Sequence, residues 1–97
     1  MITEIVTFKL PAGMTRAEVL AKYQKTAPVW QTNPDLIQKF YLYDAEQGIG
    51  GGVYLWHDRA QAEKWHGAEF RQRVKENYGA EPSSQFFETP IVVDPKP

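Results

Sequence analysis

The sequence predicts an α+β domain in which a four-stranded antiparallel sheet carries two helices on one face. Four segments show the alternating apolar pattern of β-strands, and two segments that begin with helix-capping residues separate them. The order along the chain is strand, helix, strand, strand, helix, strand. In this β-α-β-β-α-β order, the ferredoxin-like arrangement, both helices normally cover the same face of the sheet. We expect residues 1–97 to form a single domain of this kind.

Local patterns predict the first strand and the first helix. Residues 2–10 alternate, and one side of this strand is formed by Ile2, Val6, Phe8 and Leu10. Thr15 and Glu18 have the spacing of a capping box, which predicts a helix start. The buried stripe expected for this helix, from its 3.6-residue period, is Val19, Leu20, Tyr23, Ala27 and Trp30. Because Pro28 lacks an amide donor, we expect the helix to kink or end near Ala27.

The second and third strands are expected to form an antiparallel hairpin. Residues 36–44 alternate, with one face formed by Leu36, Gln38, Phe40 and Leu42 and the other by Ile37, Lys39, Tyr41 and Tyr43. A polar turn leads to three glycines at 50–52 and then to Val-Tyr-Leu-Trp, residue types that are favoured in strands. We expect the other elements to pair beside this third strand or to pack over it.

The second helix is predicted to begin at Asp58, an N-cap residue with Gln61 three positions later. Gly67 interrupts its middle, and its apolar stripe continues through Phe70, Val74 and Tyr78. Gly79 stands where a C-terminal cap glycine is typical. A fourth strand is predicted over residues 84–94, and the proline at 90 favours an edge position or a bulge.

Composition narrows the classes of function. The chain has 11 Lys and Arg against 12 Asp and Glu, a net charge of −1, which gives no electrostatic basis for binding nucleic-acid phosphates. There is no cysteine, so disulfides and thiolate chemistry are excluded. No apolar run approaches the ~20 residues of a membrane span, and the first residues do not resemble a signal peptide. We therefore expect a cytoplasmic protein without membrane contact.

The strands carry apolar residues on both faces, although two helices can cover only one. Tyr54 and Trp56 lie opposite Val53 and Leu55 in the third strand. Soluble monomers rarely expose a large apolar patch, so a second copy of the chain or a stacked nucleic acid would have to cover the other face. Because the third strand contains no Lys or Arg, we favour a homodimer formed through the sheet face.

Two stretches carry a family resemblance: Asn-Pro-Asp-Leu-Ile-Gln-Lys-Phe at 33–40 and Gly-Gly-Val-Tyr-Leu-Trp-His-Asp at 51–58. They resemble the small monooxygenases of the dimeric α+β barrel superfamily, which are related to antibiotic-biosynthesis monooxygenases, and the similarity extends over roughly residues 3–94. The resemblance implies a homodimer with facing sheets and a pocket in each subunit between sheet and helices. It also implies cofactor-independent oxidation of a small aromatic or polyketide-like compound by dioxygen.

The candidate catalytic residues are His66 and His57. In the second helix, His66 could act as a general base at the pocket rim while Trp65 stacks on an aromatic substrate. Alternatively, Trp65 belongs to the core and His66 is solvated. At the end of the third strand, His57 faces either the pocket mouth or solvent.

The candidate substrate-binding residues are Trp65, Tyr41, Trp30 and Tyr54. Each also has a purely structural interpretation, since Tyr41 suits cross-strand pairing and Trp30 suits the core. The two histidines lack metal-ligand spacing, so we expect no metal site. We expect no flavin or nicotinamide cofactor, because the triple glycine precedes a strand and not a helix N-terminus.

Haem breakdown, an activity of some relatives, is disfavoured. Those relatives use a second-helix Trp, which Trp65 matches, but also a later His and a first-strand Asn, where this chain has polar residues near Lys75 and Thr7. A non-catalytic small-ligand-binding or stress-related homodimer remains an alternative to the monooxygenase, as does an isomerase or lyase on the same scaffold.

Overall fold

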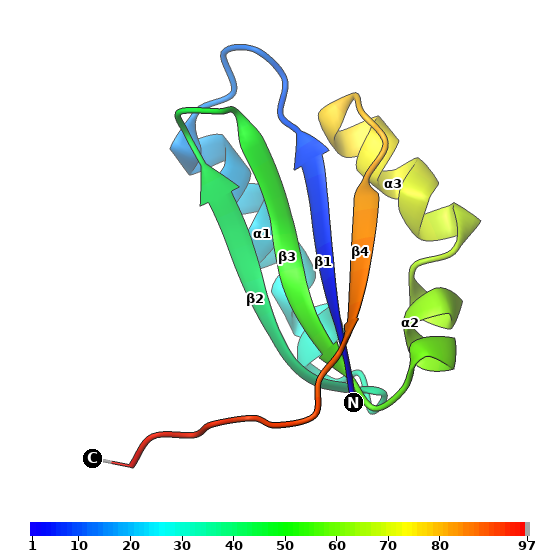
Figure 1. The fold of residues 1–97 in the computed structure, drawn as a ribbon. Coiled ribbons are helices and arrows are strands. Elements are labelled where there is room, and N and C mark those ends of the chain that lie inside the picture. Colours follow the sequence, from blue (N-terminus) through cyan, green and yellow to red (C-terminus); the bar gives the residue numbers. More distant parts are fainter. Residues whose placement is uncertain (97) are drawn as a thin grey trace.

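The computed structural model describes residues 1–96 and has the predicted α+β, ferredoxin-like architecture. Its elements are β1 (Ile2–Lys9), α1 (Arg16–Gln31), β2 (Leu36–Asp44), β3 (Ile49–Trp56), α2 (Arg59–Trp65), α3 (Ala68–Tyr78) and β4 (Ser83–Glu88). All pairings are antiparallel and the strand order is β2-β3-β1-β4, so β3 and β1 are central. The predicted second helix is interrupted and forms α2 and α3 (Figure 1).

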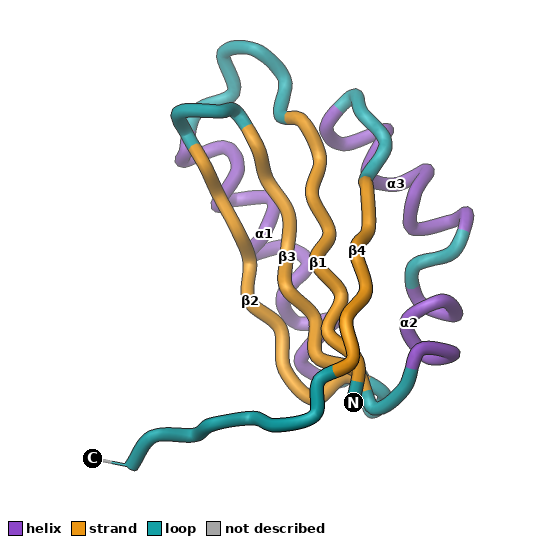
Figure 2. The backbone as a smooth tube through the Cα atoms, in the orientation of Figure 1, coloured by secondary structure: helices purple, strands orange, loops and turns teal. Residues whose placement is uncertain are grey.

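The helices lie over one face of the sheet. In Figure 1, α1 passes behind β2 and β3, whereas α3 stands on the side of β4, and Figure 2 shows the same arrangement along the backbone. Two buried clusters fill the space between the layers. One contains Phe8, Leu10, Val19, Tyr23 and Val74, and the other contains Val6, Tyr54, Trp56 and Ala62.

The predicted helix caps are present. Thr15 and Glu18 form the full capping box of α1. The Asp58 side chain accepts a hydrogen bond from the Gln61 amide at the start of α2 (3.0 Å). Gly79 ends α3 in the left-handed conformation, with φ of 79°. These residues fix where the helices begin and end, and so where α1 and α3 cross the sheet.

Pro28 does not end the first helix, which was one of the two outcomes expected there, and α1 continues to Gln31. Proline removes one amide donor from the helix. The last turn also places Trp30 against Tyr54 (ring centroids 5.3 Å apart) and Trp56 (6.2 Å). We attribute the continuation to this aromatic packing, which offsets one lost hydrogen bond.

The fourth strand is shorter than the predicted 84–94. It ends at Glu88, which pairs with Ile2 at the start of β1. Only Met1 precedes β1, and its carbonyl accepts a hydrogen bond from the Thr89 amide (3.0 Å). Pro90 therefore lies outside the sheet, in a segment that leads away from the domain (Figure 2).

The predicted faces of β2 need one correction, at its first residue. Leu36 pairs with Trp56 and Gln38 pairs with Leu55, so Ile37 is an extra residue in a β-bulge. The bulge turns Leu36 to the helix-covered face, where it packs against the second cluster, and not to the face of Gln38 and Phe40.

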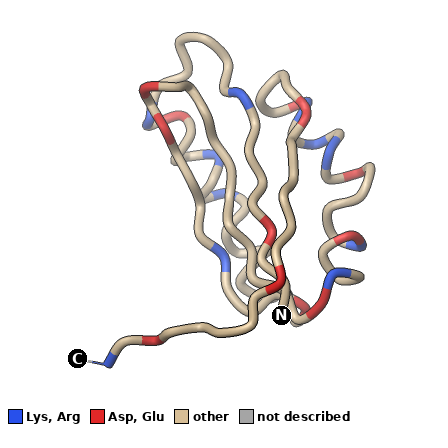
Figure 3. Tube along the Cα trace, in the orientation of Figure 1, with Lys and Arg blue, Asp and Glu red and all other residues tan. Residues whose placement is uncertain are grey.

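The opposite face of the sheet is uncovered in the single chain. Phe40 and Phe87 lie on it and are 55% and 51% exposed. Charged residues are few along the strands and more frequent on the helices and turns (Figure 3). Within residues 1–96, no helix has the length and apolar character needed to cross a membrane.

Candidate active site

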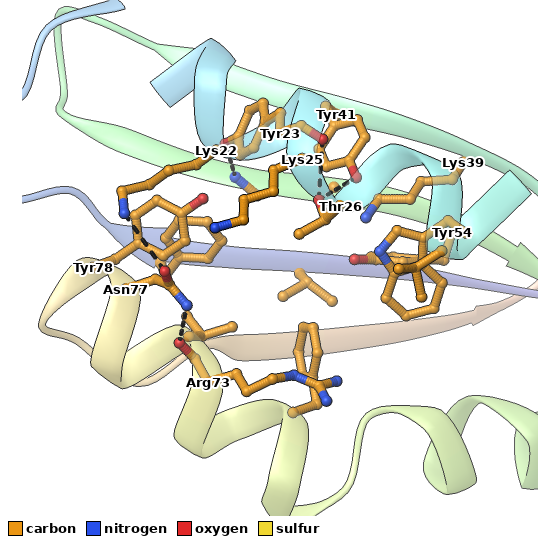
Figure 4. A pocket seen from close by; sticks show the side chains of 18 of the residues that line it. Lys22, Tyr23, Lys25, Thr26, Lys39, Tyr41, Tyr54, Arg73, Asn77 and Tyr78 are labelled. Atoms are coloured by element: carbon orange, nitrogen blue, oxygen red, sulfur yellow. Dashed lines mark hydrogen bonds between the residues drawn. The ribbon is translucent and has the colours of Figure 1, made fainter. Parts of the chain in front are cut away.

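A cavity of about 620 Å³ lies between α1 and α3, above the helix-covered face of the sheet (Figure 4). Its size is typical of small-molecule sites. Aromatic side chains come from both helices and from three strands: Tyr23, Trp30, Phe70, Tyr78, Phe8, Tyr41 and Tyr54. The cavity exists because α1 packs toward β2 and α3 packs toward β1, which leaves a channel between the two helices.

The floor of the cavity depends on glycines in β3. A Cβ atom on Gly51, where φ is 156°, would lie 1.9 Å from the Val6 carbonyl oxygen, so no larger residue fits without a backbone shift. The Gly51 amide donates a hydrogen bond to the Tyr23 hydroxyl (3.0 Å), which in turn donates to the Leu42 carbonyl (2.7 Å). Tyr23 thus ties α1 to β2 and β3 at the base of the cavity.

Lys39 of β2 is held among three aromatic rings. Its Nζ lies 3.9 Å from the ring centroid of Tyr41, 4.4 Å from that of Tyr54 and 4.5 Å from that of Trp30. Within residues 1–96, no carboxylate forms an ion pair with it. Lys39 and Tyr41 lie on the same face of β2, and the bulge at Ile37 brings Leu36 onto that face as well.

Burial lowers the pKa of Lys39 to about 7 from its ordinary 10.5, because the ammonium loses water without gaining an anion. The rings attract an ammonium and act in the opposite direction, at roughly 0.5–1 kcal/mol each at exposed sites and about 2 kcal/mol or more where the cation is desolvated. Burial is the effect that lowers the pKa of Lys39, and the three rings limit how far it falls.

The charged residues of the cavity lining are all cationic. Lys22, Lys25 and Arg73 line it together with Lys39, and none of the described lining residues is an aspartate or glutamate. Lys22 donates a hydrogen bond to the Asn77 side chain (3.5 Å), which links α1 to α3 across the cavity (Figure 4). This lining favours a ligand that carries negative charge or develops it during a reaction.

Two further hydroxyls complete the polar lining. The Tyr41 hydroxyl lies 2.7 Å from the Thr26 hydroxyl, within hydrogen-bond distance. Burial raises the pKa of Tyr41, and it raises that of Tyr78 to about 12. Both phenols are therefore neutral at physiological pH and can donate hydrogen bonds to a ligand oxygen.

A second, smaller cavity of about 300 Å³ adjoins the first. Trp30, Lys39 and Tyr41 line both cavities. Lys39 is therefore accessible both from the large cavity under α1 and from the smaller cavity beside the start of β2.

Behind the cavity wall lies a buried polar group, Glu4 of β1. Its Oε1 accepts a hydrogen bond from Trp56 Nε1 (3.0 Å) and lies 2.6 Å from His66 Nδ1. The Glu4 and His66 side chains are 0% and 3% exposed. The His66 ring stacks on Phe70 (centroids 4.0 Å apart) and meets Tyr54 edge-on (4.3 Å). The pair thus supports two aromatic residues of the cavity wall from behind.

The structure separates the six site residues predicted from the sequence into two groups. Trp30, Tyr41 and Tyr54 line the large cavity. Trp65, His66 and His57 are not part of the described lining. Trp65 is half-buried and donates a hydrogen bond to Asp35 (2.8 Å). The exposed residue His57 lies just beyond β3, whereas His66 is buried and neither reaches the rim nor is solvated.

Sequence analysis missed Lys39 as a candidate site residue. It was assigned to the same strand face as Tyr41, but strand lysines are ordinarily solvated, so the alternation alone gave no reason to select it. The available signal was its position on the strand face that also carries Tyr41 and Tyr43. A lysine on a covered face requires a cavity or a partner.

Two features bear on bound groups. Among residues 1–96, no three His, Cys, Asp or Glu side chains gather in an arrangement that could hold a metal ion. Gly50, Gly51 and Gly52 lie within β3 and pair with both β1 and β2. They therefore do not form a loop at a helix N-terminus, the structure that holds cofactor phosphates.

Comparison with solved structures shows the same fold at low sequence identity. A protein of unknown function from Nitrosomonas europaea, NE2512, has a TM-score of 0.76 at 14% identity, over 99% of this chain and 95% of that one. A protein from Deinococcus radiodurans described as "a putative antibiotic biosynthesis monooxygenase" has a TM-score of 0.72 at 10% identity, over the full length of both chains.

A third similar structure is a mutant of SnoaB, a cofactor-independent oxygenase from Streptomyces nogalater, with a TM-score of 0.66 at 13% identity over 95% of each chain. A search of curated proteins found no match. At the level of sequence, the family model described as "Putative mono-oxygenase ydhR" matches residues 5–89, most of the chain. The chain therefore belongs to the ydhR mono-oxygenase family.

Proposed function

We propose that the protein is a cofactor-independent monooxygenase that oxidises a small aromatic compound, of the phenolic or polyketide-like kind, with dioxygen. The proposal rests on the position of the Lys39 amine, which lies against three aromatic rings. The other charged residues that line the cavity are cationic. An aromatic substrate stacks on such rings, and its anion is stabilised by such cations. Family membership and the fold shared with a cofactor-independent oxygenase support the same reaction class.

In this reaction Lys39 acts as the general base. A neutral amine removes a proton from the substrate, and the ammonium that forms stays beside the carbanion or enolate. Dioxygen accepts electrons from this anion and forms a hydroperoxide, which loses water to leave a carbonyl group. Overall, one CH₂ group and one O₂ give one C=O group and one water. The apolar walls keep water from the electron-rich anion.

The two histidines remain predictions as bases. His57 is exposed, and His66 shares its Nδ1 with Glu4 behind the cavity wall. Lys39 is the stronger proposal, because a base must lie within hydrogen-bond reach of the proton it removes and Lys39 lines the cavity. The Tyr41 hydroxyl, which also lines it, is suited to hold a substrate oxygen.

We further propose that two copies pair through the uncovered face of the sheet. Across neighbouring strands this face carries a row of apolar side chains: Ile5, Phe40, Val53, Leu55 and Phe87. Soluble proteins rarely leave such a patch in water, and two-fold pairing of like surfaces is the commonest solution. A monomeric mass by light scattering at micromolar concentration would contradict this part of the proposal.

The test is dioxygen consumption with an enolisable tricyclic ketone such as anthrone, followed by product analysis. We expect one O₂ consumed per quinone-type product. The rate should rise with pH through about 7, where half of the Lys39 amines are neutral, and level off above that pH. Lys39→Met should lower kcat by roughly 10²–10⁴-fold, the usual contribution of a general base. Lys75→Met is the matched control, because Lys75 is an exposed lysine on α3 outside the cavity lining.

Two results would contradict the proposal. Tight binding of the ketone without any O₂ uptake would favour the alternative of a non-catalytic ligand-binding protein. Equal rates for Lys39→Met and the wild-type protein would be compatible with an oxygenase but would show that Lys39 is not its base. His66→Ala and His57→Ala would then be compared in the same assay.

A further inference from the structure

We propose that Lys39 is also a covalent binding site for aromatic aldehydes and ketones, which it captures as a reversible imine. The inference goes beyond the oxygenase reaction, since it needs no dioxygen. It rests on the place of Lys39 in the structure: an amine without an ion-pair partner, surrounded by three rings and open to two cavities.

The surroundings of Lys39 suit a nucleophilic amine. The charged and titratable groups that line the two cavities are Lys22, Tyr23 and Lys25 on α1, Tyr41 on β2, Tyr54 on β3, and Arg73 and Tyr78 on α3. None is a carboxylate, so no anion in this lining holds the amine as an ammonium. Burial of lysine in an apolar site is the usual way in which proteins activate it for imine formation.

The step balances without any co-reactant. The Lys39 nitrogen attacks the carbonyl carbon and forms a C–N bond, giving a carbinolamine. The carbonyl oxygen then leaves as water with the two protons that the amine carried, and a C=N bond remains. The Tyr41 hydroxyl, 2.7 Å from that of Thr26, is a neutral donor in the same cavity that can protonate the departing oxygen.

The geometry also selects the class of carbonyl compound. The rings of Tyr41, Tyr54 and Trp30 surround the Nζ at 3.9–4.5 Å, so an aromatic ring attached to the carbonyl carbon has faces to stack on. Because Lys39 lines both cavities, the ligand can occupy the larger one while water leaves through the smaller. Aliphatic carbonyl compounds lack this stacking and should show a smaller preference for Lys39 over the other lysines.

The test is reductive trapping with benzaldehyde and sodium cyanoborohydride at pH 7.5 under nitrogen, followed by intact-mass measurement and peptide mapping. We expect one benzyl group per chain, on Lys39, with at least a tenfold preference over every other lysine. Propionaldehyde at the same concentration should label Lys39 with a smaller preference over the other lysines. Labels spread evenly over the lysines, or placed elsewhere with Lys39 unmodified, would overturn the inference.

Substitutions of lysine provide a second test of the labelled site. Lys39→Arg keeps a positive charge but cannot form an imine, so the single label should disappear, whereas Lys9→Arg should retain it. Peptide mapping of the wild-type chain decides the site even where Lys39→Arg fails to fold. Because the assay excludes oxygen and turnover, absence of oxygenase activity leaves this inference standing, and absence of a Lys39 label leaves the oxygenase proposal standing.

Discussion

Replacing Lys39 with methionine should change how stability depends on pH. The folded chain binds the Lys39 proton only below its lowered pKa of about 7, whereas the unfolded chain binds it up to about 10.5. Between these values the unfolded state carries more protons, so the stability of the wild-type protein rises with pH. Methionine has no proton to bind, and the variant lacks this contribution.

The size of this change in unfolding free energy follows from the pH range between the two pKa values. Each pH unit between the two pKa values contributes about 1.36 kcal/mol. From pH 7 to pH 9, the unfolding free energy of the wild-type protein should therefore rise by roughly 2–3 kcal/mol relative to that of Lys39→Met. Attraction of the ammonium to Tyr41, Tyr54 and Trp30 reduces this figure. Below pH 7 both states are protonated, and the difference between the proteins becomes constant.

Urea unfolding followed by tryptophan fluorescence at pH 6, 7, 8 and 9 measures the effect. Subtracting the two proteins at each pH cancels the titration of every group that they share. Lys75→Met is the control, because Lys75 is an exposed lysine on α3 and its replacement should leave the pH profile parallel to that of the wild-type protein. Parallel profiles for Lys39→Met as well would refute the claim that burial lowers the pKa of Lys39.

Three other predictions concern the scaffold of the site. Tyr23→Phe leaves the buried Gly51 amide without its acceptor, so urea unfolding should show a loss of about 1–3 kcal/mol with an unchanged m-value. Glu4→Ala leaves His66 without its buried partner and should cost about 3–5 kcal/mol, measured in the same way; a loss below about 1 kcal/mol would contradict the buried pair. Phe40→Glu places a charge on the uncovered face, and light scattering should then report a monomer under conditions where the wild-type protein is a dimer.

Most of the fold could be predicted from the sequence because its signals are local. The capping residues Thr15 and Asp58 and the terminal Gly79 are satisfied within a few residues, and each acts as expected. The differences come from long-range contacts. Packing of Trp30 on the sheet accompanies the continuation of α1 past Pro28, and the fourth strand ends where its partner strand does.

The cavity was only partly predictable. Aromatic residues on covered faces, such as Trp30, Tyr41 and Tyr54, are recognisable from periodicity, and all three line it. Periodicity does not show where α1 and α3 move apart, however. This separation decides whether an aromatic residue is packed in the hydrophobic core or lines the cavity. The space between α1 and α3 also allows Lys39 to lie beneath the helices without an ion-pair partner. The lowered pKa of Lys39 therefore depends on tertiary packing, which the sequence pattern does not show.

The position of His66 shows why helical phase failed as a guide to the site. Rotation by about 100° per residue, which predicted His66 at the rim beside Trp65, holds only inside a continuous helix. α2 ends at Trp65, and His66 is its C-cap residue, with φ of −107° and ψ of 37°. This break turns the imidazole inward to Glu4 of β1, on the covered side of its strand. Gly67 in the sequence and an acid between the apolar residues of the first strand were the two available signals. Their combination indicates an inward polar residue at a helix break, which packs behind the cavity wall.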